Sequence, residues 1–172
     1  MTEIICAGFG GQGVLITGMI LAYCGMQEGK YFTWYPSYGS EMRGGTANCN
    51  VKISEEEIAS PYAKHLDILV SMNDVAIDKF EPTMKPGAVL VANSSLLDET
   101  RIFRDDIKVV KEIASGLGNP KGTNIVMLGA LCKETGLFEK NFMKYSIDEY
   151  FAKKGKVNPK NALCFDAGVK AV

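Results

Sequence analysis

Apolar runs alternate with amphipathic stretches along most of the chain. Residues 3–7 form a short apolar run that predicts a buried strand, and residues 11–26 then place apolar side chains at helical spacing. Residues 31–35 are rich in aromatic and β-branched side chains, which predicts a second strand. Residues 47–53 alternate between apolar and polar side chains, which predicts a third strand. Because only a short loop joins the second and third strands, the two could pair antiparallel.

The rest of the chain repeats the order of strand, then helix. Residues 67–72 and 88–92 are nearly continuous apolar runs, which suit strands covered on both faces. Helices are predicted over 74–80, 124–135, 139–153 and 159–168. These repeats predict an α/β fold, a three-layer α/β/α sandwich with a mostly parallel, mixed sheet and a Rossmann-like glycine turn after the first strand. Residues 97–122 predict no clear element. Without a linker or an internal repeat, we expect one domain over 1–172.

Composition narrows the functional classes. The chain has 172 residues, of which 47% are hydrophobic and 23% charged, enough to bury one sizeable core. With 19 Lys and Arg against 20 Asp and Glu, the net charge of −1 creates no bulk field that would attract nucleic acid or an anionic membrane. No stretch approaches the roughly 20 apolar residues of a membrane span, and no basic region precedes an apolar one at the start. We therefore expect a cytoplasmic protein.

The cysteines and the histidine indicate no metal site. The five cysteines are scattered, without a C-x-x-C pair or a histidine at ligand spacing. We expect small buried hydrophobes, with Cys49 alone near a suspected functional loop. An iron–sulfur cluster that works with this protein would sit on another chain. His65 has no Ser or Cys arranged as a nucleophile, so no residue is assigned a catalytic role.

The first predicted strand opens into a glycine cluster, AGFGGQGVLITG. Gly8, Gly10 and Gly13 match the G-x-G-x-x-G spacing, which lets the chain turn tightly and directs helix N-terminal amides at a phosphate or another anion. An NAD or FAD site would also need an acidic residue at the end of the second strand. That strand ends in TWYP, and Glu28 precedes it, at the wrong end of the sheet. The motif alone is therefore a weak indication, and close packing of helix on strand explains the glycines as well.

A second cluster, YGSEMRGG over residues 38–45, follows the second strand. The loop should lie at the same carboxyl edge as the glycine turn, where open α/β sheets bind ligands. Tyr38 and Glu41 lie there beside Arg43 and the flexible Gly44. Arg43 could bind a phosphate or carboxylate bidentately. A solvated Glu41–Arg43 pair is the alternative interpretation.

These clusters belong to a longer series of motifs that runs through nearly the whole chain. In order, the series is GFGGQGV, YGSEMRGGTANC, SP, MKPG, NIVMLGAL and KNALCFDAG. One family has these motifs in the same order, and the chain resembles its members: the gamma subunits of the 2-oxoacid:ferredoxin oxidoreductases. Ser40 stands where that family often has proline, so we expect a less rigid loop.

The resemblance implies a function shared among several chains. Enzymes of this family oxidatively decarboxylate a 2-oxoacid, pass the acyl group to coenzyme A and send the electrons to ferredoxin, in an anaerobic type of metabolism. The resemblance implies that the alpha and beta subunits hold thiamine diphosphate, with Mg²⁺ in the complex, and that a beta or delta subunit holds the iron–sulfur clusters. This chain by itself is expected to hold no cofactor and to be inactive. The loop PSYGSEMRGGTANC over residues 36–49 resembles that of the 2-oxoglutarate and branched-chain 2-oxoacid branches of the family. We expect 2-oxoglutarate as the substrate.

The resemblance also gives the glycine turn a ligand. We expect its amides to bind an anionic portion of coenzyme A or a loop of a partner subunit, and the second cluster to lie at the subunit junction. The residues assigned to cofactor binding are Gly8, Gly10, Gly11, Gln12, Gly13, Tyr38, Glu41, Arg43 and Gly44. The alternatives are a stand-alone nucleotide-binding or assembly module and an NAD- or FAD-binding oxidoreductase with a degenerate fingerprint.

Overall fold

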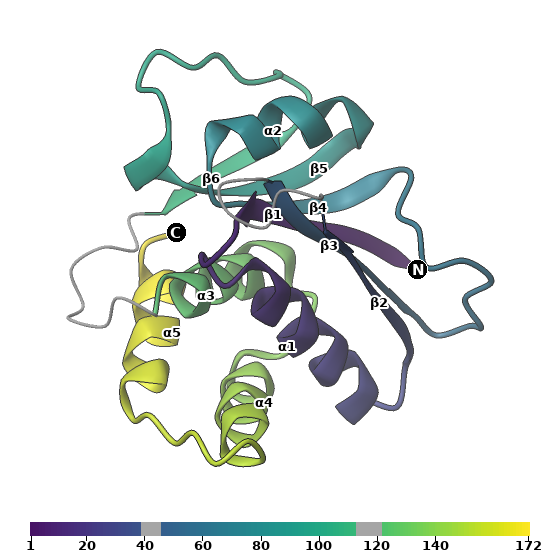
Figure 1. Cartoon of the computed structure of the whole chain (residues 1–172), viewed down its shortest axis with the longest axis vertical. Coiled ribbons are helices and arrows are strands. Elements are labelled where there is room, and N and C mark those ends of the chain that lie inside the picture. The colour runs from purple at the N-terminus through teal and green to yellow at the C-terminus, as the bar shows by residue number, and fades with distance from the viewer. Residues whose placement is uncertain (39–45, 113–121) are drawn as a thin grey trace.

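The computed structural model describes residues 1–38, 46–112 and 122–172. Within these residues, a six-stranded sheet has the order β2-β3-β1-β4-β5-β6 (Figure 1). The strands are β1 (Thr2–Phe9), β2 (Tyr31–Tyr38), β3 (Thr46–Ser54), β4 (Leu66–Ser71), β5 (Met84–Asn93) and β6 (Lys108–Glu112). Strand β3 pairs antiparallel with β1 and β2, whereas β1, β4, β5 and β6 pair in parallel. The mixed sheet and the antiparallel third strand are confirmed.

Helices cover both faces of the sheet, as the alternating pattern predicted. Figure 1 shows α2 on one face, and α1, α3, α4 and α5 on the other. The helices are α1 (Val14–Gln27), α2 (Asp74–Phe80), α3 (Thr123–Thr135), α4 (Lys140–Ala152) and α5 (Lys160–Lys170), with 3-10 turns η1 (Glu81–Thr83) and η2 (Ser94–Leu96). The layers are therefore helix, sheet and helix.

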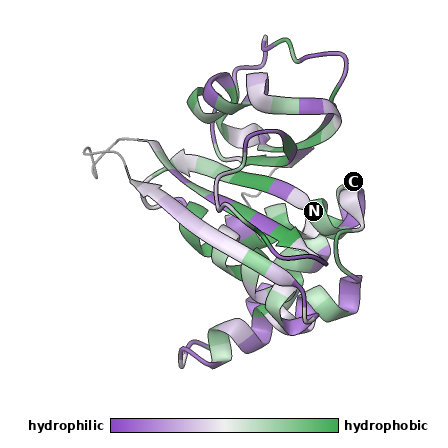
Figure 2. Ribbon diagram, turned by 90° about the vertical axis from the view of Figure 1, so that its right-hand side faces the viewer, coloured by the Kyte–Doolittle hydropathy of each residue, from purple (hydrophilic) through white to green (hydrophobic). Residues whose placement is uncertain are grey.

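Each layer of helices closes its own hydrophobic core. The larger core lies between the sheet and the layer of α1, α3, α4 and α5, and it includes Ile4, Leu21 and Met127. The smaller core includes Leu69 and Ile77 beneath α2. Figure 2 shows the hydrophobic colour concentrated in the inner strands and the helices packed on them. The strands between the two cores are buried on both faces, which explains their nearly continuous apolar runs.

Strand β6 lies in the segment where the sequence predicted no clear element. It has five residues, and lysines at both Lys108 and Lys111 interrupt its apolar character. Its backbone pairs with β5 from Val89↔Lys108 to Asn93↔Glu112. Pairing with an existing strand stabilises this short segment, and no local signal in the sequence reports such a long-range contact.

Helices α3 and α5 pack backbone against backbone at two glycines. A Cβ atom placed on Gly129 would overlap the carbonyl oxygen of Phe165, and one placed on Gly168 would overlap the carbonyl oxygen of Val126. Gly129 and Gly168 therefore permit the close packing of the two helices. This crossing fixes where α3 lies on the sheet.

A buried ion pair holds the connection between β3 and β4 over the sheet. Lys52 Nζ lies 3.2 Å from Glu3 Oε1, and the two side chains are only 7% and 11% exposed. Glu3 Oε2 accepts hydrogen bonds from the backbone N–H groups of Lys64 at 2.7 Å and His65 at 2.9 Å. Burial raises the pKa of Glu3, but the two backbone hydrogen bonds and Lys52 together lower it below its ordinary value.

Substituting the helix-crossing glycines should destabilise the fold. We expect Gly129→Ala and Gly168→Ala each to lower the free energy of unfolding by about 1 to 3 kcal/mol, because the overlapping atoms belong to the backbone and cannot rotate away. Gly25→Ala in α1 is the matched control, since its Cβ would lie at an ordinary 3.4 Å from Ile53 and gains helix propensity. Urea denaturation measures all three variants. Equal stability of Gly168→Ala and Gly25→Ala would contradict the backbone packing.

The Glu3 carboxylate should make the protein sensitive to acid. Because the pKa of Glu3 is lower in the folded than in the unfolded chain, its stabilising contribution is complete above the unfolded pKa and is lost as the pH falls through the folded pKa. We expect Glu3→Gln to be less stable at pH 7 and to lose less stability than the wild type below about pH 4.3. Thermal denaturation from pH 3 to pH 7 measures this, with the exposed Glu56→Gln as control. Parallel wild-type and Glu3→Gln curves would contradict it.

Candidate functional site

The glycine turn between β1 and α1 is closed by a side chain of its own. Gln12 Oε1 accepts a hydrogen bond from the Phe9 N–H at 2.7 Å, and the Gln12 N–H donates to the Phe9 carbonyl oxygen at 3.3 Å. Gly11 has φ +90° and Gly13 has φ +77°, a region that glycine adopts at low cost. The turn thus places Gly10 and Gly11 in an exposed position.

Strand β4 ends against this turn. The Met72 N–H donates to the Ala7 carbonyl oxygen at 2.9 Å, and Asn73 Nδ2 lies 3.4 Å from Gln12 Oε1. A Cβ on Gly8 would lie 2.6 Å from Gln12 Oε1 and 2.7 Å from the Met72 Cβ. Gly8 therefore permits the close approach of the two strand ends, and the glutamine bridges them.

The N-terminus of α3 adjoins the N-terminus of α1. The Asn124 carboxamide lies against Gly13, and its Nδ2 would be 3.0 Å from a Cβ placed on that glycine. Asn124 is the second residue of α3 and is only 5% exposed. No motif in the sequence indicates a role for this residue. The glycine at position 13 is therefore required for the helix–helix contact as well as for its positive φ.

The end of β2 lies at the same edge of the sheet. Tyr38 pairs with Ala47, and Ala47 pairs with Gly8 on its other side. The backbone thus places Tyr38, at the start of the second cluster, two strands from the glycine turn. Glu41, Arg43 and Gly44 lie outside the described residues, and their roles stay predictions.

The strand order differs from that of a dinucleotide-binding sheet. In the Rossmann arrangement the second strand lies beside the first, so that its terminal acid reaches the ribose. Here the antiparallel β3 lies between β1 and β2, which separates their ends by about 10 Å. Glu28 is the C-cap of α1, and its Oε2 lies 2.8 Å from Lys30 Nζ. The geometry therefore does not favour NAD or FAD.

The cysteines lie inside the fold. All five are buried, and burial raises the pKa of Cys24 to about 12. Cys49 Sγ donates to the Val14 carbonyl oxygen at 3.7 Å. In the part of the chain that the structure describes, no three His, Cys, Asp or Glu side chains gather as metal ligands. The described residues therefore offer no fit for a metal ion.

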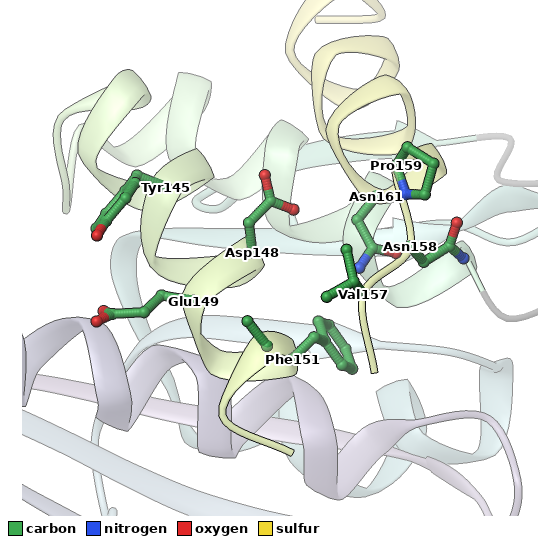
Figure 3. Close-up of a pocket in the computed structure, with 9 residues that line it drawn as sticks. Tyr145, Asp148, Glu149, Phe151, Val157, Asn158, Pro159 and Asn161 are labelled. Carbon is green, nitrogen blue, oxygen red and sulfur yellow. The ribbon is translucent and has the colours of Figure 1, made fainter. Parts of the chain in front are cut away.

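A shallow pocket of about 350 Å³ lies between α4 and α5, away from the turn. Figure 3 shows Asp148 projecting from α4 toward α5, with Asn158 and Asn161 across the pocket. Its wall includes Val157, which is 81% exposed. Glu149, also in the wall, accepts a hydrogen bond from Tyr23 in the last turns of α1. The pocket is open and lacks a set of donors directed at one point.

The Gln12 side chain should be needed for a stable turn. We expect Gln12→Ala to lower the free energy of unfolding by about 1 to 3 kcal/mol, because the Phe9 N–H loses its acceptor. Gln27→Ala is the matched control, since the hydrogen bonds of Gln27 are exposed. Urea denaturation compares the two variants. A Gln12→Ala protein as stable as Gln27→Ala would contradict this role of the carboxamide.

Comparison with known proteins identifies the family. Residues 3–171 match the sequence profile described as pyruvate ferredoxin/flavodoxin oxidoreductase. The chain belongs to this family. It is 37% identical to the ketoisovalerate oxidoreductase subunit VorA of Methanothermobacter thermautotrophicus over 95% of this chain and 35% of that one. It is 35% identical to the 2-oxoglutarate synthase subunit KorC of Methanocaldococcus jannaschii over 96% of this chain and 91% of that one. The expected resemblance is confirmed.

Solved structures share the fold. The gamma subunit of a keto/oxoacid ferredoxin oxidoreductase from Geobacter sulfurreducens has a TM-score of 0.79 and 27% identity, covering 99% of this chain and 98% of that one. A 2-oxoglutarate:ferredoxin oxidoreductase from Magnetococcus marinus, with 2-oxoglutarate, coenzyme A and succinyl-CoA bound, has a TM-score of 0.84 and 25% identity, covering 99% of this chain and 30% of that one.

The relatives differ in length. The chain spans about a third of the VorA subunits it matches, at 35% and 34% of their lengths. No helix among the described residues combines the length and apolar character needed to cross a membrane.

Proposed function

We propose that this chain is the gamma subunit of a 2-oxoacid:ferredoxin oxidoreductase complex. The complex converts a 2-oxoacid and coenzyme A to the acyl-CoA and CO₂, and two electrons pass to ferredoxin as the thiol proton is released. The observation that carries the proposal is the family match over residues 3–171, together with a fold shared with a gamma subunit over its whole length. The cytoplasm is the proposed location and 1–172 the proposed single domain.

The names of the relatives, which are subunits, support a chain that works with partner subunits. The KorC relative is covered over 91% of its length, whereas VorA is nearly three times as long as the matching region. We assign the remaining functions to alpha and beta subunits, or to alpha, beta and delta subunits. Thiamine diphosphate with Mg²⁺, when bound by those partners, supplies the electron sink for decarboxylation, and their iron–sulfur clusters carry the electrons.

The substrate is proposed to be 2-oxoglutarate. Four of the KorC relatives are named 2-oxoglutarate synthase subunits, at 32% to 35% identity. The VorA relatives, named for ketoisovalerate, keep the branched-chain 2-oxoacids as the competing class. Substrate choice depends mostly on the alpha and beta chains, so the assay must include both classes.

The role proposed for this chain is to hold coenzyme A at the glycine turn. In the turn, the N–H groups of Gly10, Gly11 and Gly13 have no acceptor within the described part of the chain, whereas that of Gln12 does. Free N–H groups that precede a helix bind anions, and coenzyme A carries phosphates. The coenzyme A-bound relative from Magnetococcus marinus supports the choice of ligand.

Capture of the complex tests the proposed function. We expect the tagged chain, purified anaerobically from its own host, to retain thiamine- and cluster-bearing partners. That preparation should reduce a viologen dye in a reaction that needs both coenzyme A and 2-oxoglutarate. The isolated chain should be colourless and inactive. A yellow chain with an intrinsic flavin spectrum, or a captured complex without oxoacid oxidation, would contradict the proposal.

Arg43 is proposed to contact a charged group of the ligand. We expect Arg43→Ala to weaken coenzyme A binding to the complex by about 2 to 5 kcal/mol, at least about thirtyfold, because a desolvated charge loses its partner. Arg43→Lys keeps the charge without the bidentate geometry and should be intermediate. Calorimetry measures the affinity, and size exclusion measures assembly. Unchanged affinity with lost assembly would assign Arg43 to subunit docking instead.

A further inference from the structure

Two of the five cysteines face each other across neighbouring strands. Cys6 of β1 pairs with Cys49 of β3 in the antiparallel register, and both side chains are fully buried in the larger core. Residues that face each other in antiparallel strands have Cα atoms about 4.5 to 5.5 Å apart and side chains on the same face. Disulfides span Cα separations of about 4.4 to 6.8 Å. The strand pairing therefore holds these two cysteines at the separation of a disulfide.

The two sulfurs also interact directly. The Cys6 thiol donates a hydrogen bond to the Cys49 sulfur, and the Cys49 thiol donates to the Val14 carbonyl oxygen at 3.7 Å. The other three cysteines lie on helices: Cys24 on α1, Cys132 on α3 and Cys164 on α5. Cys6 and Cys49 are thus the pair that the sheet itself brings together.

Hydrogen-bond donors surround the Cys49 sulfur. The hydrogen bond from Cys6 lowers the pKa of Cys49, and the Trp34 indole N–H and the backbone N–H groups of Gly18 and Cys6 add to this effect, although burial opposes it. The same hydrogen bond, together with burial, raises the pKa of Cys6. Since the thiolate is the reactive form of cysteine, Cys49 is the nucleophile of the pair and Cys6 keeps its proton.

The Trp34 side chain is a separate observation that points to an anionic sulfur. Its Nε1 is buried and has no acceptor in the part of the chain that the structure describes. A Cβ placed on Gly18 would overlap the Cys49 sulfur and would lie 3.2 Å from Trp34 Nε1, so both atoms lie around one point beneath α1. A buried donor without an acceptor is costly, and a thiolate at Cys49 offsets that cost by accepting its hydrogen bond.

The start of α1 offers a route to this sulfur. The helix begins at Gly13 without a side-chain cap, and its first turns, up to Gly18, cover Cys49. Helix ends open more readily than helix interiors, and the absence of a cap favours such opening. Opening of these turns admits a molecule as small as hydrogen peroxide to Cys49.

We propose that Cys6 and Cys49 form a redox-active dithiol, which hydrogen peroxide oxidises to a disulfide between β1 and β3 and which a thiol reductant restores. The Cys49 thiolate attacks one peroxide oxygen and the O–O bond breaks. The sulfur becomes a sulfenic acid, and the departing hydroxide takes up the proton that Cys49 had released. The Cys6 sulfur then attacks the Cys49 sulfur, the S–O bond breaks, and water leaves with the Cys6 proton. Two thiols thus lose two electrons, and one peroxide becomes two water molecules.

The disulfide would enclose the segments assigned to ligand binding. All the residues assigned to cofactor binding, from Gly8 to Gly44, lie between Cys6 and Cys49 in the sequence. Oxidation therefore closes a covalent loop around the glycine turn and joins the two strands that lead into and out of this segment. The inference is independent of the proposed function, because the dithiol needs neither coenzyme A nor a partner subunit.

Peroxide treatment of the whole chain tests the dithiol. We expect the reduced wild type, treated at neutral pH, to lose two hydrogen atoms by intact mass and to yield a linked peptide pair containing Cys6 and Cys49. Dithiothreitol should reverse both changes. Cys24→Ser is the matched control and should form the same disulfide, because Cys24 is equally buried and its pKa is raised to about 12 by burial. In the wild type, Cys49 should be oxidised at least about tenfold faster than Cys24.

Two single variants identify the attacking sulfur. In Cys6→Ser the second thiol is missing, so the Cys49 sulfenic acid should accumulate and be labelled by dimedone, which reacts with sulfenic acids. In Cys49→Ser, Cys6 should stay unlabelled, because its thiol keeps its proton. Thermal denaturation checks folding, and Cys6→Ala and Cys49→Ala give the same comparison should a buried serine destabilise the core.

Three outcomes would overturn the proposal. The first is a folded wild type that keeps both thiols reduced after the peroxide has oxidised Met26, whose side chain is exposed. The second is equal oxidation rates at Cys24 and Cys49, because the thiols would then react through unfolding of the whole chain. The third is equal dimedone labelling of Cys6 in Cys49→Ser and of Cys49 in Cys6→Ser, because neither sulfur would then be activated by its surroundings.

Discussion

The hydrogen bonds accepted by the Gln12 carboxamide determine the course of the chain at the functional edge. One oxygen receives the Phe9 N–H at 2.7 Å and lies 3.4 Å from Asn73 Nδ2, so it links the end of β1 to the end of β4. The turn can be this tight only because Gly8 leaves room for the glutamine and for Met72. From this point α1 is directed back under the sheet, and its free N-terminus remains at the carboxyl edge. The architecture of the proposed ligand site follows from that one turn.

The crossing of α3 and α5 fixes the position of α3 at the same edge of the sheet. Gly129 and Gly168 let α3 and α5 meet at backbone distance, which fixes α3 against the sheet. With α3 fixed in this way, Asn124 reaches Gly13, and the N-termini of two helices adjoin. Donors that are held in place before a ligand arrives lose little entropy on binding it. The packing of the helices, through Val126 and Gly129 in the first two turns of α3, therefore prepares the site.

The neutral donors in the described part of this edge suit a shared active site. The described residues bring together N–H groups and carboxamides at the edge of the sheet, and the buried thiols and ion pairs belong to the fold. In the function we propose, this chain positions coenzyme A while partner subunits carry the decarboxylation and the electron transfer. Such a division explains why the described residues at the turn of a member of an oxidoreductase family include no catalytic acid or base.

The sequence by itself determined the elements whose signal is local. Apolar runs specified β1, β4 and β5, helical periodicity specified α1 and α3 to α5, and the glycine spacing specified the turn, because each depends on neighbours along the chain. The short connection also indicated the antiparallel β3. Only the tertiary structure placed β3 between β1 and β2, added β6 to the sheet edge, and brought Asn124 to Gly13. Those features depend on contacts between segments far apart in the chain, where packing and backbone pairing decide and local propensity carries no information.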